Sequence, residues 1–431
     1  MTMNAVIAQE SPSWLSGSVG DRGQPLPTTN SQHSIMKNLS SLALAGKRVL
    51  MRVDFNVPLD KETREVTDDT RIRAALPSIR YVLQQPGTSL VLMSHLGRPK
   101  GGPDEQNSLK PVLAVLSEQL GQPVRFASDC IGVDAFQLSQ NLLPGEVLLL
   151  ENVRFYPQEE QGDVEFARQL SRHGGVYVND AFGTAHREHA STATIAQFFG
   201  DEKAAGFLME AEVNNADRVM QQAQRPFTAI MGGAKVSDKI LIIENLMSRV
   251  DTLVIVGAMA YTFIRAMGGQ TGASLCEEDK LDLARSLMQQ AEAKGVKWVL
   301  PVDSVAADRF AADAATRVVP SSAIPDGWMG LDIGPQAAHE MGTIIGNSRT
   351  LLWNGPAGVF EMAPFSGGSL QLARAMADAT DNGAFSLIGG GDSAAAVNSF
   401  GLTERMSYVS TGGGALLEYM EGKVLPGVAA L

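Results

Sequence analysis

From Lys47 onward, one pattern of apolar and polar positions recurs along the chain. A short run rich in leucine and β-branched residues ends in a polar or glycine-rich loop, and a helix-like stretch follows. These runs, each given with the loop that follows it, are RVLMRV before Asp54, SLVLMS before His95, EVLLLE before Asn152, VYVND before AFGTAHR, FTAIM before GGAKVSDK, TLVIV before GAMAYT, WVLPV before Asp303, TLLW before NGPAGVFE, FSLI before GGGDS and MSYVS before TGGG. Apolar strands that alternate with helices are typical of parallel sheets covered by helices on both faces. The pattern therefore predicts an α/β fold with doubly wound parallel sheets, which bind ligands outside the carboxyl ends of their strands.

The loops in the two halves of the chain differ in their chemistry. In the first half they are rich in guanidinium and imidazole groups, carried by Arg71, His95, Arg98, Arg154, His186 and Arg187. Such groups suit a small anion with several negative charges. In the second half the loops carry glycines, two lysines and isolated carboxylates, which suit a nucleotide and its metal ion. We therefore expect two doubly wound, Rossmann-like domains that each hold one ligand.

The segment GFLMEAEVNNADRVMQQAQRP, residues 206–226, has the pattern of a helix and separates the two sets of loops. It is either an ordinary surface helix or a connector that transmits a hinge motion between the domains. On this basis the first domain covers residues 36–205 and the second begins at residue 206.

The first 35 residues are rich in Ser, Pro, Gly, Thr and Gln and show no apolar periodicity. They lack the apolar centre of a secretory signal and the arginines of a transit peptide. Their composition predicts a disordered N-terminal extension over residues 1–35. A second interpretation is that translation begins at Met36, where the ordered pattern starts.

Composition and charge narrow the classes of partner. The chain has 431 residues, a formal net charge of −12 and two scattered cysteines, Cys130 and Cys276. An acidic chain is a poor partner for nucleic acid, and two cysteines make neither a disulfide framework nor a zinc site. No apolar run approaches the ~20 residues of a membrane helix. We therefore expect a cytoplasmic protein with small-molecule substrates and neither a nucleic-acid nor a membrane partner.

The stretch SLIGGGDSAAAVNSFG, residues 386–401, predicts a strand, a tight turn and the start of a helix. Free backbone N–H groups and a positive dipole end make such a start suitable for an anion. Gly389, Gly391 and Ala394 also match the dinucleotide fingerprint G-x-G-x-x-A. A Rossmann unit needs an acidic residue after the next strand, however, and MSYVS ends in TGGG. This counts against an NAD-dependent oxidoreductase, and no Walker A loop is present either.

Three charged residues near the glycine-rich loops allow two interpretations each. Lys235 and Lys239 are four residues apart and would share one face of a helix, either as a solvated pair or around an anion. Asp392, directly after the three glycines, is either a helix N-cap or a magnesium ligand beside nucleotide phosphates. In the basic set, His95 and His186 are either general bases or hydrogen-bond donors to phosphate.

Taken together, these motifs show that the chain from about Met36 to Leu431 resembles the phosphoglycerate kinase family. The stretches that carry the resemblance are RVDFNVPLD, SHLGRPKG, LLLENVRFYPQEE, YVNDAFGTAHR, MGGAKVSDKI, MGLDIGP, LLWNGPAGVFE, IGGGDSAA and STGGGALLEYMEGKVLPGV. The resemblance implies reversible phosphoryl transfer between 1,3-bisphosphoglycerate with ADP and 3-phosphoglycerate with ATP. It also implies Mg²⁺ as cofactor, a monomer, and a C-terminal segment, residues 418–431, that completes the first domain after the second ends at residue 417.

The resemblance assigns site residues at positions of this chain. It implies that the glycerate substrate is bound by Asp54, Phe55, Asn56, Arg71, His95, Leu96, Gly97, Arg98, Arg154, His186 and Arg187. It implies that the nucleotide is bound by Gly233, Ala234, Lys235, Lys239, Gly257, Gly330, Asn354, Glu361, Gly390, Gly391, Asp392 and Ser393. Arg71, Lys235 and Lys239 would be catalytic, and Asp392 would hold the metal.

Direct in-line transfer is the physical expectation, since nothing in these loops indicates a covalent intermediate. The two domains should then close over both substrates, so that the reacting atoms approach within about 3–3.5 Å.

The chain departs from the family in one loop, where the family commonly has three glycines and this sequence has Val256, Gly257 and Ala258. This departure puts the affinity for the nucleotide base in doubt. A binding or scaffold protein without turnover remains the alternative of a different class.

Overall fold

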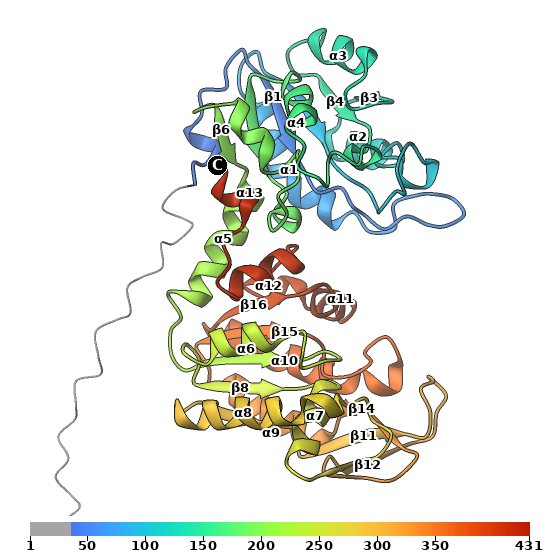
Figure 1. Ribbon diagram of the computed structural model, residues 1–431, viewed down its shortest axis with the longest axis vertical. Helices are drawn as coiled ribbons and strands as arrows, with labels where there is room; N and C mark the ends of the chain where they lie inside the picture. Colours follow the sequence, from blue (N-terminus) through green and yellow to red (C-terminus); the bar gives the residue numbers. More distant parts are fainter. Residues whose placement is uncertain (1–35) are drawn as a thin grey trace, which may run out of the picture.

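The computed structural model describes residues 36–431, which form two α/β lobes, one above the other in Figure 1. The expectations for residues 1–35 lie outside the described residues. The upper lobe is built on a six-stranded sheet with the order β3-β4-β2-β1-β5-β6. All of its strand pairs are parallel. The strands are β1 (Arg48–Arg52), β2 (Ser89–Met93), β3 (Val124–Ala127), β4 (Val147–Leu150), β5 (Val176–Asn179) and β6 (Lys203–Ala205).

The lower lobe is built on a second six-stranded parallel sheet, with the order β10-β8-β7-β15-β16-β17. Its strands are β7 (Phe227–Met231), β8 (Thr252–Ile255), β10 (Lys297–Val299), β15 (Thr350–Asn354), β16 (Phe385–Gly389) and β17 (Tyr408–Val409). Two parallel sheets wound with helices confirm the predicted fold class.

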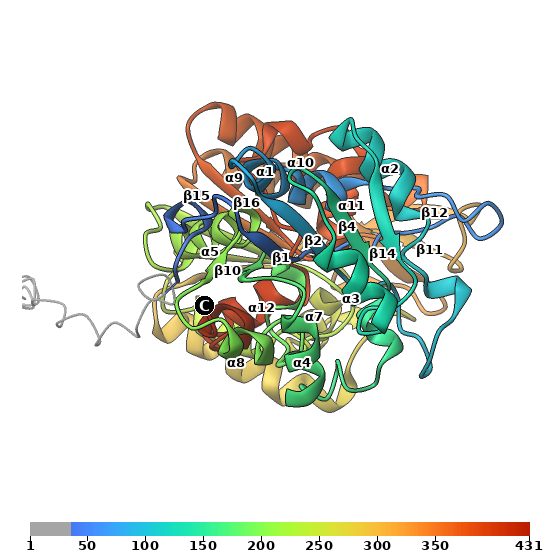
Figure 2. The same ribbon diagram turned by 90° about the horizontal axis from the view of Figure 1, so that it is seen from above.

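Helices cover both faces of each sheet because consecutive strand residues point to opposite sides. In β1, Leu50 packs into one apolar cluster, whereas Val49 and Met51 pack into another. Figure 2 shows α1 and α4 on opposite sides of this sheet. The helices of the upper lobe are α1 (Thr70–Leu83), α2 (Val112–Leu120), α3 (Val133–Gln140) and α4 (Val164–Ser171).

The lower sheet has α9 and α10 on one face and α6, α7 and α8 on the other. The helices after α5 are α6 (Ile240–Leu246), α7 (Met259–Ala266), α8 (Leu281–Ala293), α9 (Pro335–Gly346), α10 (Gly367–Asp381), α11 (Gly391–Ser399), α12 (Gly414–Met420) and α13 (Pro426–Ala429). Short 3₁₀ helices are η2 (Leu39–Ser41), η3 (Glu105–Asn107), η4 (Val153–Phe155), η5 (Phe182–Thr184), η6 (Thr194–Phe198), η7 (Glu278–Lys280), η8 (Ala363–Phe365) and η9 (Thr403–Arg405).

One region of the lower lobe breaks the alternation of strand and helix. The strands β11 (Asp303–Ala307), β12 (Thr316–Pro320) and β14 (Met329–Ile333) form an antiparallel sheet, and β9 (Gln270–Thr271) pairs with β13 (Ala323–Ile324). The run before Asp303 does hold a strand, β10, but Asp303 does not open a loop followed by a helix as the pattern predicts, since it begins β11. Its carboxylate accepts a hydrogen bond from the backbone N–H of Ala337 (2.7 Å) and so caps the N-terminus of α9.

The helix α5 (Phe207–Met220) runs between the lobes, as the pattern of residues 206–226 predicts (Figure 1). Two buried carboxylates attach it to different parts of the chain. Asp180, after β5, accepts hydrogen bonds from the N–H groups of Leu208 and Met209 (2.9 and 3.2 Å). Glu212, within α5, accepts a hydrogen bond from the N–H of Thr411, after β17 (2.7 Å). The helix is therefore anchored at the carboxyl ends of both sheets.

After α12, the chain returns to the upper lobe, where α13 lies (Figure 1). The N–H of Gly427 donates to the carbonyl of Ala185 (2.8 Å), and the carbonyl of Gly427 accepts from the side chain of Asn179 (3.3 Å).

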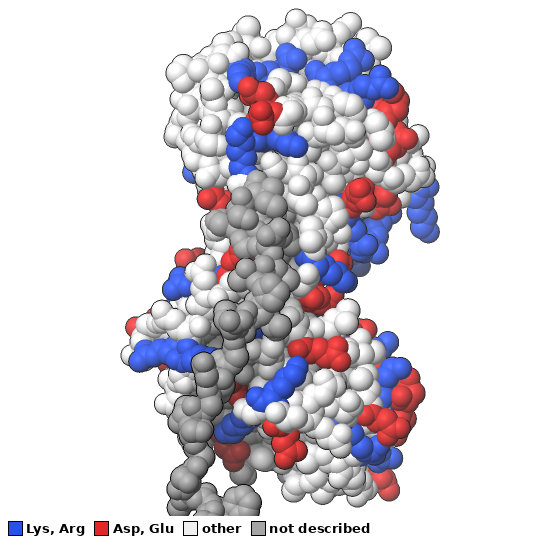
Figure 3. Space-filling view, turned by 60° about the vertical axis from the view of Figure 1, so that its left-hand side comes forward, with Lys and Arg blue, Asp and Glu red and all other residues white. Residues whose placement is uncertain are grey.

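None of the helices in residues 36–431 is long and apolar enough to cross a membrane. On the face drawn in Figure 3, Lys and Arg side chains are interspersed with Asp and Glu.

His173 is a buried titratable group that links α3 to the core of the upper lobe. Its Nε2 lies 2.9 Å from the carbonyl oxygen of Cys130 and its Nδ1 lies 2.9 Å from the hydroxyl of Ser139. The ring also stacks on Phe136 at 4.7 Å between centroids. Burial lowers the pKa of His173 to about 4, because the charged form would lose its hydration.

This lowered pKa makes folding sensitive to acid. The folded state binds the proton more weakly than the unfolded state, so the stabilisation is present above pH 6.5 and is lost as the pH falls toward 4. The loss is on the order of 3 kcal/mol at 1.4 kcal/mol per pKa unit. We expect a His173→Gln variant to lose less stability than the wild type between pH 6.5 and 4 in urea unfolding. The exposed His339→Gln should follow the wild type, and identical pH profiles for all three proteins would contradict this account.

Candidate active site

The basic residues predicted from the sequence gather at the carboxyl end of the upper sheet. Asp54 follows β1, and its carboxylate accepts a hydrogen bond from the guanidinium of Arg71 in the first turn of α1 (2.9 Å). The Nδ1 atom of His95, after β2, lies 3.9 Å from the same carboxylate. The side chain of Asn56 accepts from the N–H of Gly97 (2.9 Å), which ties the loop after β1 to the loop after β2. The acidic residue therefore orients Arg71 rather than neutralising the whole cluster.

Arg52, the last residue of β1, is a further cation of this cluster that the sequence analysis missed. Its side chain is fully buried, its Nη2 lies 3.2 Å from Nδ1 of His95, and its Nε donates to Ser191 (2.8 Å). Buried Glu159 accepts a hydrogen bond from the same serine hydroxyl (2.6 Å) and so supplies a nearby counter-charge. Arg52 could not be recognised from the sequence, because it lies within an apolar strand where a cation is not expected.

Arg154 and the histidines of the cluster lie close enough to affect one another electrostatically. The guanidinium of Arg154 donates to the carbonyl of Gly97 (3.0 Å) and lies 3.3 Å from Glu160. Burial and the neighbouring arginines lower the pKa of His95 well below its usual value. The same two causes lower the pKa of His186, and they lower that of His189 to about 4. These histidines are therefore neutral at pH 7, and His189 is a second residue that the sequence analysis missed.

The remaining residues predicted for this half-site are placed less uniformly. Arg98 and Arg187 are exposed and extend the cluster toward solvent. Phe55 and Leu96 are buried in the apolar core, so only their backbone can face a ligand. The carbonyl of Leu96 is already occupied by a hydrogen bond from the side chain of Asn152 (2.7 Å).

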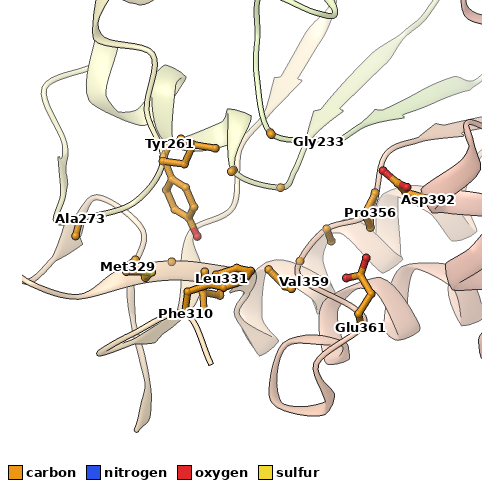
Figure 4. A pocket seen from close by; sticks show the side chains of 17 residues that line it. Gly233, Tyr261, Ala273, Phe310, Met329, Leu331, Pro356, Val359, Glu361 and Asp392 are labelled. Carbon is orange, nitrogen blue, oxygen red and sulfur yellow. The ribbon is translucent and has the colours of Figure 1, made fainter. Parts of the chain in front are cut away.

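The lower lobe holds a cavity of about 510 Å³ at the junction of its parallel and antiparallel sheets (Figure 4). Six residues predicted for nucleotide binding line it, namely Gly233, Ala234, Gly257, Gly330, Glu361 and Asp392. Figure 4 shows Tyr261, Met329, Phe310 and Leu331 at one end of the cavity and the carboxylates of Glu361 and Asp392 toward the other. An apolar end beside a polar end suits a base that is joined to a charged group.

The apolar wall of this cavity was not recognisable from the sequence pattern. Tyr261, Leu275, Phe310, Met329, Leu331 and Val359 all line it. Four of them lie within or beside the strands that break the alternation of strand and helix, so no repeating pattern marked them. The side chain of Phe310 is 60% exposed. An exposed aromatic side chain can mark a binding surface, but this exposure is visible only in the structure.

At the charged end of the cavity, the predicted strand, turn and helix of the glycine-rich loop are confirmed. The strand β16 ends at Gly389, Gly390 follows with φ of 83°, and α11 begins at Gly391. The side chain of Asn354, the last residue of β15, is fully buried and accepts a hydrogen bond from Nζ of Lys239. Its Nδ2 has no hydrogen-bond partner within residues 36–431. An unpartnered donor beside a helix N-terminus marks a place for an anion.

Two details of this end differ from the sequence analysis. Lys235 and Lys239 do not share a helix face, because residues 235–239 form a turn and α6 begins only at Ile240. Asp392 is not the N-cap of α11, since Gly390 holds that position and Asp392 lies in the first turn. Ser393 is buried, and its hydroxyl accepts from the N–H of Gly355 (2.6 Å), which ties α11 to the loop after β15.

The loop at residues 256–258 has its two unusual side chains in different surroundings. Val256 is fully buried in the core between β8 and α9. Ala258 lines the cavity, together with Gly257. Only Ala258 can therefore affect the space for a nucleotide base, and its effect on affinity stays a prediction.

The side chains at this end of the cavity fit a magnesium ion that is held partly by the protein and partly by a bound substrate. Within residues 36–431, no group of three or more His, Cys, Asp or Glu residues could hold a metal ion. Asp392 lines the cavity at the start of α11, and its carboxylate makes no hydrogen bond or ion pair with another described residue. Mg²⁺ is commonly bound by one or two carboxylates together with substrate phosphates. A single free carboxylate at a helix N-terminus is consistent with that pattern.

Comparisons with known proteins agree with this arrangement. The family model described as Phosphoglycerate kinase matches residues 39–423. The chain belongs to the phosphoglycerate kinase family.

The alignments with curated relatives in this family cover most of this chain and most of each relative. A phosphoglycerate kinase from Porphyromonas gingivalis is 53% identical over 90% of this chain and 98% of its own. A cytosolic phosphoglycerate kinase from Nicotiana tabacum is 53% identical over 92% and 99%. A chloroplastic one from Volvox carteri is 52% identical over 91% and 85%. Relatives in the family therefore come from more than one compartment.

Solved structures in the family share the fold as well. The structure of phosphoglycerate kinase from Coxiella burnetii has a TM-score of 0.82 at 40% identity, and covers 92% of this chain and 98% of its own. The structure from Pyrococcus horikoshii has a TM-score of 0.79 at 30% identity, with the same coverage. Membership confirms the predicted enzyme class, a phosphotransferase with a carboxyl group as acceptor, and the prediction against an oxidoreductase.

The cavity wall allows a test of where the nucleotide binds. A Cβ atom on Gly330 would come within 2.0 Å of the hydroxyl of Tyr261, which is buried and donates to Ser304 (3.0 Å). We expect a Gly330→Ala variant to displace Tyr261 and to weaken MgADP binding about tenfold, or about 1.4 kcal/mol, at the lower end of the roughly 1–3 kcal/mol that overpacking typically costs. Isothermal titration calorimetry measures this. Gly346→Ala is the matched control, because a Cβ there meets nothing within 4 Å. Unchanged affinity in a folded Gly330→Ala variant would place the nucleotide elsewhere.

Proposed function

We propose that this enzyme catalyses Mg²⁺-dependent phosphoryl transfer between 1,3-bisphosphoglycerate with ADP and 3-phosphoglycerate with ATP, by direct in-line transfer. The observation that carries the proposal is the pair of complementary half-sites. A cluster of arginines and histidines lies at the end of one sheet, and a cavity with a helix N-terminus and lysines lies at the end of the other.

In the upper half-site, the cations would hold the phosphate and carboxylate of the glycerate substrate. Arg71 is fixed by Asp54, which leaves part of its guanidinium free to face the transferring phosphoryl group. Arg154 is fixed by the carbonyl of Gly97 in the same way. His95 and His186 would donate hydrogen bonds rather than act as bases, because an ionised acceptor oxygen needs no proton removed.

In the lower half-site, the apolar end of the cavity would take the nucleoside, with Glu361 toward the ribose. The phosphates would lie against the N-terminus of α11 and the side chain of Asn354, within reach of Lys239. Lys235 is exposed in the same loop and is free to follow the transferring group. These cations stabilise the charge that spreads over the equatorial oxygens in the transition state.

Asp392 would hold the Mg²⁺ ion together with the nucleotide phosphates. When bound, the ion neutralises phosphate charge and orients the leaving and attacking oxygens. The protein would supply this ligand from the first turn of α11, the same turn whose N–H groups would face the phosphates.

The proposed domains are residues 36–205 with residues 418–431, and residues 206–417. Within residues 36–431, no hydrogen bond or ion pair joins the basic cluster to the loop of residues 233–239. The reacting atoms must nevertheless approach within about 3–3.5 Å. Closure of the two domains about α5 would bring them together and exclude water. We further propose that the enzyme acts as a cytoplasmic monomer on small-molecule substrates.

A coupled assay tests the reaction itself. The purified chain is given ATP, Mg²⁺ and 3-phosphoglycerate, and the formation of 1,3-bisphosphoglycerate is followed. We expect Mg²⁺-dependent turnover that is lost in Asp392→Ala and retained in Asp282→Ala, an exposed carboxylate on α8. A folded protein that binds both ligands without turnover would instead be a scaffold, the alternative of a different class.

Lys235 is proposed to act on the transition state rather than on the bound nucleotide. We expect Lys235→Ala to lower kcat by about 100-fold or more, in the range for loss of one oriented charge. The Kd for MgADP should change by less than about threefold, as expected for an exposed cation. Stopped-flow kinetics and calorimetry measure the two quantities, with Lys297→Ala on the far end of β10 as control. Equal losses in kcat and affinity would refute the assignment.

Arg187 is proposed to bind the glycerate substrate only. Its replacement by alanine should raise the Kd for 3-phosphoglycerate about tenfold, since one charge-assisted hydrogen bond contributes about 1.5–3 kcal/mol and this one is exposed. The Kd for MgADP should not change. The matched control is Arg168→Ala, an exposed arginine on α4 that pairs with Glu165. An unchanged Kd for 3-phosphoglycerate would remove Arg187 from the site.

A further inference from the structure

A carboxylate outside both half-sites holds the turn between the two candidate lysines. Glu277 lies just before η7, and its Oε2 accepts hydrogen bonds from the N–H groups of Val236 (2.6 Å) and Ser237 (3.1 Å). Its Oε1 accepts a hydrogen bond from the hydroxyl of Ser237 (2.5 Å). One side chain therefore satisfies three donors in the residues that separate Lys235 from Lys239.

Glu277 is itself fixed at both ends of its backbone. Its N–H donates to the hydroxyl of Thr262 on α7 (3.1 Å), and its carbonyl accepts from the N–H of Lys280 (2.9 Å). These two hydrogen bonds fix the backbone that carries the carboxylate. The turn that the carboxylate binds is therefore held in place as well.

The position of this turn determines where both lysines lie. Val236 is fully buried, and its carbonyl accepts from the N–H of Lys239 (2.9 Å). Without Glu277, two backbone N–H groups next to the phosphate site would lose their acceptor and could bind phosphate themselves. With Glu277 in place, the ammonium groups are the donors that this turn presents to an anion.

Glu277 also belongs to the segment that forms one wall of the cavity. Ala273 and Leu275, four and two residues before it, line the end of the cavity that is proposed to hold the base. A base that packs against this segment therefore contacts the same stretch of chain that fixes the lysine turn.

We infer that Glu277 is a positioning residue, which couples the base-binding segment of residues 273–277 to the placement of Lys235 for phosphoryl transfer. The inference rests on the proposed function, since Lys235 is assigned to the transferring group there. Glu277 touches neither substrate, and its effect on the rate passes through the turn of residues 235–239.

A double-mutant cycle tests this coupling. We expect Glu277→Ala to lower kcat about tenfold, the loss that follows from releasing a charge-assisted hydrogen-bond network. In a Lys235→Ala background the same substitution should lower kcat less than about twofold, because coupled residues are not additive. Glu277→Gln should recover most of the rate, since its amide oxygen can accept from both N–H groups and its NH₂ can donate to Ser237. Equal losses in both backgrounds would overturn the inference.

Hydrogen exchange tests the positioning without reference to turnover. Amides in residues 233–239 should exchange faster in Glu277→Ala than in the wild type or in Glu277→Gln, whereas residues 391–399 should be unchanged. Glu278→Ala is the matched control, because Glu278 is exposed and pairs with Arg265. Unchanged exchange in residues 233–239 would overturn the inference even if the wild type proved inactive. Normal wild-type turnover with an additive cycle would overturn it and leave the proposed function intact.

Discussion

The carboxyl ends of parallel strands converge on one edge of a sheet, and both half-sites are built at such edges. Asp54 and His95 follow neighbouring strands of the upper sheet. In the lower sheet, Asn354 ends one strand and Gly390 follows its neighbour. Residues that are far apart in the sequence therefore meet without long loops. Because each sheet has its own edge, the same constraint also separates the two half-sites.

The structure also has to provide partners for the cations that it buries or partly buries. The upper half-site places Arg52 wholly inside the lobe, with Glu159 nearby through the hydroxyl of Ser191. The lower half-site anchors Lys239 on the side chain of Asn354, and Glu277 takes the free donors of the adjacent turn. In each case a partner fixes the cation, and the ammonium group of Lys239 keeps part of its hydrogen-bonding capacity for a ligand.

Much of this could be predicted from the sequence, for identifiable reasons. The parallel sheets were predictable because continuous apolar runs ended in loops at regular intervals, and the glycine-rich loop before α11 was predictable from its turn residues. The antiparallel strands around β11 were not, because they interrupt that alternation, and Phe310 was missed with them. Arg52 was missed because its burial depends on partners more than 100 residues away. The turn at residues 235–239 was misjudged as helix because Glu277, about 40 residues later, fixes it.

The proposed phosphoryl transfer depends on one further event, the closure of the two domains over both substrates. Small-angle X-ray scattering measures it most directly, with the chain alone, with 3-phosphoglycerate, with MgADP, and with this non-reacting pair together. The anchoring of α5 at both sheets by Asp180 and Glu212 predicts a smaller radius of gyration when both ligands are bound. An unchanged radius of gyration in the saturated ternary complex of an enzyme that turns over would contradict the account.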